Sequence, residues 1–147
     1  MTELPVIFTD LDGTLLDHDT YSAEEARSVL ERVTALGVPV IPATSKTYSE
    51  VIEFRKLMNL PHAFIVENGA ALYVPIESDI RCPMGSKLFE GYWVREFGVK
   101  RQALCDVLEA LDMSGTYQFK SLTDMRSAEV AEITGLDLAA AQRAQQR

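Results

Sequence analysis

Residues 6–16 read VIFTDLDGTLL, and this stretch decides the fold because an apolar strand runs directly into two carboxylates and a glycine. Side chains alternate between the faces of an extended segment, so Asp10 and Asp12 point to the same side and Leu11 points into the core. Two neighbouring acids repel each other unless a cation lies beside them, and Mg²⁺ with oxygen ligands is the usual solution. The stretch therefore predicts a magnesium site at Asp10 and Asp12, and the plainer alternative is an Asp-rich turn after a buried strand.

The composition limits the kinds of partner that this protein can bind. Its 147 residues are 47% hydrophobic, enough for one packed domain or one domain and part of another, and they carry a formal net charge of −8. Nucleic acids and anionic membrane surfaces require an excess of Lys and Arg, so neither is expected as a partner. No apolar run approaches the roughly 20 residues that cross a bilayer, and the first residues do not resemble a signal peptide, so we expect a cytoplasmic protein. Cys82 and Cys105 lack metal-site spacing and are expected to be reduced thiols.

A strand–helix–strand unit follows the opening stretch. Ser22 and Glu25 have the spacing of a capping box, apolar residues then recur at helical spacing, and Gly37 is expected to end the helix. Residues 38–43 form a second buried strand in this interpretation, which implies a parallel pair with a right-handed crossover. Residues 44–47, reading TSKT, then lie at the same edge of the sheet as the two carboxylates, where open α/β sheets bind ligands.

A second helix and a hairpin complete this region. Thr47 and Glu50 have the spacing of another capping box, so helix capping is an alternative to a substrate role for the TSKT segment. Residues 63–67 read as a third apolar strand, and Asn68-Gly69 is typical of a tight turn leading into a strand over residues 70–74.

The run DLDGT at residues 10–14 resembles the first motif of the haloacid-dehalogenase superfamily. This resemblance implies an α/β fold with a Rossmann-type parallel sheet, and a Mg²⁺-dependent phosphomonoester hydrolase that forms an aspartyl-phosphate. By the resemblance, Asp10 attacks the phosphoryl group and Asp12 is the general acid and base, with Mg²⁺ held at Asp10 and Asp12. A phosphoacceptor signalling module also uses an Asp at a strand end, but it needs neither the second Asp nor a cap.

The second motif of that superfamily is a Ser or Thr that hydrogen-bonds the phosphoryl oxygens, and the resemblance gives this role to Thr44. Ser45 is the neighbour most easily confused with it, and Lys46 stands where related phosphatases often hold a basic residue near the substrate. Two interpretations of Lys46 stay open: a solvated charge on the surface, or a contact with the phosphate of the substrate. The run Asn68-Gly69-Ala70 resembles a segment near the active site of phosphatases with large caps, which implies that Asn68 contacts substrate. Making the turn remains its first role.

Residues 122–137 and 144–147 are similar to the cap of mannosyl-3-phosphoglycerate phosphatases. The sequence pattern changes from about Cys82, and residues 116–119 read as a strand. The resemblance implies that residues 1–81 are the N-terminal part of the core and that residues 82–147 form a mixed α/β cap. It also implies a small phosphorylated sugar or glycerate as substrate, with mannosyl-3-phosphoglycerate or a related phosphorylated glycoside favoured over generic sugar phosphates.

The third and fourth motifs of the superfamily, a Lys and an acidic Gly-Asp pair, normally lie beyond the cap and are not found here. We therefore expect an incomplete core and a cap that is incomplete at its C-terminus. An inactive fragment or a sugar-phosphate-binding remnant is the alternative function. A half-built sheet also leaves apolar edges uncovered, which favours self-association.

Overall fold

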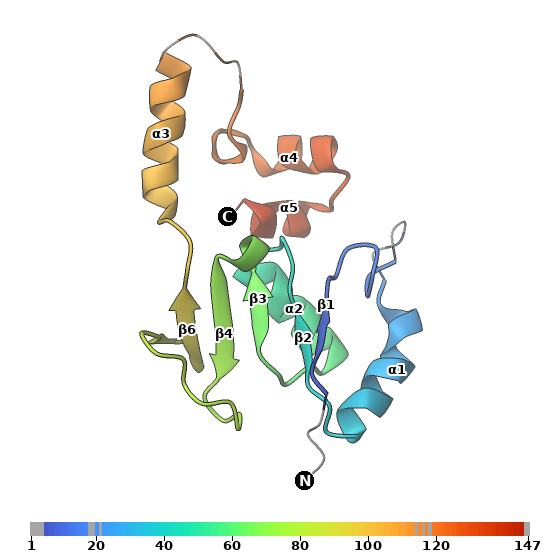
Figure 1. Cartoon of the computed structure of the whole chain (residues 1–147). Coiled ribbons are helices and arrows are strands. Elements are labelled where there is room, and N and C mark those ends of the chain that lie inside the picture. Colours follow the sequence, from blue (N-terminus) through green and yellow to red (C-terminus); the bar gives the residue numbers. More distant parts are fainter. Residues whose placement is uncertain are drawn as a thin grey trace. The chain divides into compact units, whose positions relative to one another are not determined.

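A computed structural model describes residues 5–17, 20, 22–113, 115, 117 and 119–145 (Figure 1). The chain divides into two compact units, Met1–Phe97 and Gly98–Arg147. No helix in the described ranges is both long and apolar enough to cross a membrane.

The first unit begins with the predicted strand–helix–strand arrangement. Strand β1 (Ile7–Thr9) is followed by helix α1 (Glu24–Ala35) and strand β2 (Val40–Pro42), and β1 and β2 pair in parallel with Phe8 opposite Ile41. Gly37 adopts a left-handed conformation (φ 71°) just after α1, which a residue with a side chain rarely takes, so it ends the helix as predicted.

The reciprocal capping box predicted at Ser22 and Glu25 does not form, although the Ser22 hydroxyl accepts the Glu24 amide (3.2 Å). Helix α1 begins one residue later than that pattern requires, with Ala23 as its N-cap. The reason is a competing contact: the carbonyl of Ser22 accepts a hydrogen bond from the amide of Asp17 (2.9 Å) and closes the preceding loop instead of starting the helix. The box predicted at Thr47 is confirmed, because Thr47 and Glu50 exchange both capping bonds at the start of helix α2 (Tyr48–Met58).

The remaining strands form a second, antiparallel sheet. Strand β3 (Phe64–Val66) leads through a 3-10 turn, η1 (Glu67–Gly69), to β4 (Ala71–Pro75), which also pairs with β6 (Tyr92–Glu96), and β6 pairs with β5 (Lys87–Phe89). A single parallel bridge between Ala43 and Ile65 connects this sheet to the end of β2. The predicted hairpin is therefore present, but its turn is a 3-10 turn and not a two-residue one.

The unit boundary falls after Phe97, whereas the boundary expected from the sequence was after residue 81. Pairing explains the difference, because β6 follows residue 81 yet lies hydrogen-bonded along the whole of β4. The second unit contains helix α3 (Arg101–Met113), a 3-10 turn, η2 (Leu122–Asp124), and helices α4 (Ser127–Thr134) and α5 (Leu138–Ala144). Of the strand predicted at residues 116–119, Tyr117 and Phe119 lie in no strand, and residues 116 and 118 lie outside the described residues. That the second unit is a cap stays a prediction.

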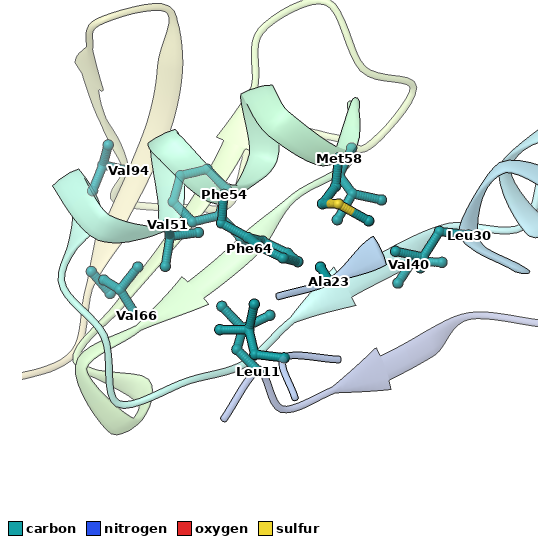
Figure 2. Packing of buried hydrophobic residues seen from close by; sticks show 13 residues of the cluster. Leu11, Ala23, Leu30, Val40, Val51, Phe54, Met58, Phe64, Val66 and Val94 are labelled. Carbon is teal, nitrogen blue, oxygen red and sulfur yellow. The ribbon is translucent and has the colours of Figure 1, made fainter. Parts of the chain in front are cut away.

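The core of the first unit lies between α2 and the strands. Figure 2 shows Val51 and Phe54 of α2 in one cluster with Phe64 and Val66 of β3, and Leu11 belongs to the same cluster and is fully buried. Leu11 thus points inward, as the alternation of the opening stretch predicted.

Strand β1 lies at the edge of its sheet and carries exposed apolar side chains. Phe8 keeps 62% of its surface accessible, and no strand of the described residues pairs with the free edge of β1. The expected uncovered apolar edge is present.

Candidate active site

Two carboxylates flank a buried leucine directly after β1. Asp10 and Asp12 are exposed, while Leu11 between them is buried, and Asp10 Oδ1 accepts a hydrogen bond from the Leu11 amide (2.7 Å). The Leu11 carbonyl accepts the amides of Thr14 (3.2 Å) and Leu16 (2.8 Å), which folds the following residues into a compact loop. Because the Leu11 side chain is buried, the side chains of Asp10 and Asp12 on either side of it face the surface.

The loop after β2 is held by backbone hydrogen bonds to β1 and to the end of β3. The Ala43 amide donates to the Thr9 carbonyl (2.8 Å), and the Thr44 amide donates to the Ile65 carbonyl (3.2 Å). The Asn68 amide in turn donates to the Thr44 carbonyl (3.0 Å), and Thr44 is only 4% exposed. The three strand ends are thereby tied into one edge, where open α/β sheets bind their ligands.

A cavity of about 410 Å³ lies at this edge. Its polar lining contains four residues predicted from the sequence: Asp10, Thr44, Ser45 and Asn68. Pockets of this size commonly hold small-molecule ligands. Ala43, Ile65 and Gly69 complete the lining and were missed from the sequence, where the only available signal was their position at strand ends.

Lys46 is not a solvated surface charge. Its Nζ lies 2.8 Å from Asp12 Oδ1, and its side chain is 15% exposed, against 40% for Asp12. The Lys46 amide donates to Thr44 Oγ1 (3.3 Å), and its carbonyl accepts the Glu67 amide (3.0 Å). The ion pair and these backbone contacts place an ammonium group between the two loops that carry the predicted site residues.

Asn68 does make the turn, in a left-handed conformation (φ 55°, ψ 34°) that Asn tolerates better than most residues. It also lines the cavity. The two roles proposed for it from the sequence are therefore compatible in one geometry.

The donors available for Mg²⁺ fit the ion in type but are few. Carboxylate oxygens suit a hard cation, and Mg²⁺ often binds through one or two carboxylates with waters and substrate phosphate completing the octahedron. Asp10 could supply one such carboxylate, whereas that of Asp12 is paired with Lys46. No group of three or more His, Cys, Asp or Glu side chains that could hold a metal occurs in the part of the chain that the structure describes.

Two curated relatives align with nearly the whole chain. It is 36% identical over 145 residues to the glucosyl-3-phosphoglycerate/mannosyl-3-phosphoglycerate phosphatase of Persephonella marina, and 35% identical over 142 residues to the protein of that name from Methanococcoides burtonii. Each alignment covers 97% of this chain but only 52% of the relative. The chain thus spans about half the length of the curated relatives that it matches.

A solved structure and a family model point the same way. A phosphatase of the haloalkanoate enzyme superfamily from Bacteroides thetaiotaomicron has a TM-score of 0.58 with 17% identity, covering 92% of this chain and 48% of its own, which supports the fold alone. The model for haloacid dehalogenase-like hydrolases matches residues 7–81, about half of this chain. These residues include β1, both carboxylates, the Thr44 loop and the Asn68 turn, and the chain accordingly belongs to the haloacid dehalogenase-like hydrolase family.

Proposed function

We propose that this chain carries the nucleophile half of a Mg²⁺-dependent phosphomonoester hydrolase. The supporting observation is that Asp10, Thr44, Ser45 and Asn68 line one cavity, next to an Asp12–Lys46 ion pair. A carboxylate nucleophile, hydroxyl donors and a cation are the groups that phosphoryl transfer requires, because the transferring group spreads negative charge over its oxygens.

In the proposed reaction, Asp10 attacks the phosphorus in line and the bond to the leaving oxygen breaks, leaving an aspartyl-phosphate. The leaving alkoxide takes a proton from Asp12. Water then attacks the aspartyl-phosphate and gives a proton back to Asp12, which releases inorganic phosphate and restores Asp10. Mg²⁺, when bound, would neutralise charge on the phosphoryl oxygens.

The Lys46 contact has a consequence for this cycle. An ion pair requires a carboxylate, whereas the first proton transfer requires a carboxylic acid at Asp12. We infer that Lys46 releases Asp12 when a phosphate dianion enters the cavity, and that its ammonium then contacts the phosphoryl oxygens.

The substrate that we propose is a phosphorylated glycoside of the kind named in the two relatives, glucosyl- or mannosyl-3-phosphoglycerate. A generic sugar-phosphate phosphatase would instead turn over a broad panel of sugar phosphates equally. The second candidate function is a sugar-phosphate-binding fragment without turnover. The pairing of the Asp12 carboxylate with Lys46, which leaves Asp10 to supply a carboxylate for Mg²⁺, favours it for residues 1–147 alone.

The test compares phosphate release from mannosyl-3-phosphoglycerate by residues 1–147 and by a version extended over the remaining length of the Persephonella marina relative. We expect Mg²⁺-dependent turnover in the extended version, little or none from residues 1–147, and complete loss in the extended Asp10→Asn variant. The amide is nearly isosteric with the carboxylate but a poor nucleophile. Normal turnover by the extended Asp10→Asn variant would reject Asp10 as the nucleophile.

A further inference from the structure

Helix α2 carries a buried arginine near its C-terminal end. Arg55 is only 7% exposed, and its guanidinium lies over the ring of Phe64, 4.5 Å from the centroid. Nη1 donates to the hydroxyl of Tyr92 (2.8 Å), and Nη2 donates to the carbonyl of His62 (2.5 Å). These contacts tie β6 and the segment before β3 to the helix.

No carboxylate in the described part of the chain offsets the charge of Arg55, although its guanidinium lies over the rings of Phe64 and Tyr92. Both hydrogen-bond acceptors are neutral, and no carboxylate among the described residues forms an ion pair with this guanidinium. Its Nε is buried without a hydrogen-bond partner. A guanidinium has five donors, and a buried charge is costly unless an opposite charge pairs with it. The aromatic rings offset part of that cost, and an anion in contact with the guanidinium would offset more.

A cavity of about 280 Å³ adjoins this side chain. Arg55, Lys56, Asn59 and Tyr92 supply its polar lining, and Ile52, Leu60 and two prolines supply an apolar wall. No acidic residue lines it, and it shares no lining residue with the cavity of Asp10. The cavity therefore combines a buried cation, a second cation and an amide with a hydrophobic surface.

We propose that this cavity is a second ligand site, which binds a small organic anion by its carboxylate or phosphate group. The anion pairs with Arg55 and Lys56, and the side-chain amide of Asn59 donates a hydrogen bond to it. The short apolar part of the ligand lies against Ile52 and Leu60. Pairing with the anion lowers the free-energy cost of burying the Arg55 charge. Binding should therefore also raise the free energy of unfolding of the first unit. This site does not rest on the proposed function.

The site is tested by titrating ¹⁵N-labelled protein with butyrate and, separately, with inorganic phosphate, against sodium chloride at equal ionic strength. We expect saturable millimolar shifts of the Lys56 and Asn59 amides with at least one of the two anions. Butyrate alone indicates that the apolar body is needed, and phosphate alone indicates recognition of the charged group. Binding of phosphate at the other cavity shifts the amides of Ser45 and Asn68 instead, so the two sites are read separately.

Variants identify the groups that bind. Lys56 is exposed, so Lys56→Gln should fold normally and weaken binding about two- to fivefold, the range of an exposed ion pair. Arg32→Gln makes the same charge change at an exposed position on α1 and should leave the affinity unchanged. Arg55→Lys should weaken binding about tenfold or more, because the fork geometry is lost. Its fold is first checked by circular dichroism, and if it unfolds, Asn59→Gly, which keeps the left-handed backbone, replaces it. No saturable shift with either anion, or equal effects of Lys56→Gln and Arg32→Gln, would overturn the proposal.

Discussion

Replacing Thr47 by Val should destabilise the first unit through the start of helix α2. Thr47 is 2% exposed, its Oγ1 lies 2.8 Å from Glu50 Oε2, and it accepts the Glu50 amide at 3.4 Å. Valine keeps the shape of threonine but cannot accept that amide. Loss of an N-cap costs about 1 kcal/mol, with a range of about 0.5–2 kcal/mol. Because Glu50 Oε2 also loses its hydrogen bond from the Thr47 hydroxyl, we expect a value in the upper half of that range.

Thr47→Ser is the matched control because it keeps the hydroxyl and removes one buried methyl group. That removal should cost about 0.8 kcal/mol, less than the loss of the cap. Urea unfolding measures both free energies, and in thermal unfolding 1 kcal/mol corresponds to about 4–8 °C for a domain of this size. A Thr47→Val protein as stable as wild type, or less affected than Thr47→Ser, would refute the reasoning that the cap stabilises this helix.

Three further outcomes are expected. Burial, and then the Arg55 charge, lower the pKa of His62 below 6.5. The unfolded chain therefore takes up a proton that the folded chain does not, and the free energy of unfolding should fall from about pH 7 to pH 5, less steeply in His62→Asn. Phe8→Thr should reduce self-association in sedimentation velocity, whereas Met84→Thr, at an exposed loop position, should not. Calorimetry should show millimolar or weaker Mg²⁺ binding to residues 1–147, further weakened by Asp10→Asn, and micromolar affinity would contradict the sparse donor set.

The parts of the fold that the sequence predicted depend on short-range patterns. The alternation around Leu11 and the capping spacing at Thr47 each involve a few neighbouring residues, and both are present in the structure. The identical spacing at Ser22 does not form a box. The Ser22 hydroxyl accepts the Glu24 amide, but its carbonyl accepts the Asp17 amide within the preceding loop, and the helix begins one residue later. A local pattern shows that a residue is able to cap a helix. It does not show whether that residue makes the capping bond or a competing hydrogen bond in the loop.

Features that depend on long-range pairing could not be predicted in the same way. Strand β6 pairs with β4 although a loop and β5 separate them in the chain, so the change in sequence pattern near residue 82 does not coincide with the boundary between the compact units. The ion pair between Asp12 and Lys46 also connects distant segments, and the sequence could place them only at one edge of the sheet. The capping pattern of the second helix likewise does not indicate that Arg55 is buried.

Backbone hydrogen bonds, more than side-chain contacts, hold the walls of the Asp10 cavity. The bonds from Ala43 to Thr9, from Thr44 to Ile65 and from Asn68 to Thr44 all lie within the first unit. Replacing the Asp10 carboxylate by an amide changes none of them. The Asp10 side chain accepts the Leu11 amide, which the amide oxygen of Asn can also accept, and the Asp10 carbonyl keeps its hydrogen bond from the Thr9 hydroxyl (2.9 Å). Asp10→Asn should therefore keep the cavity and remove the nucleophile, so that loss of activity in that variant reports on chemistry and not on the shape of the site.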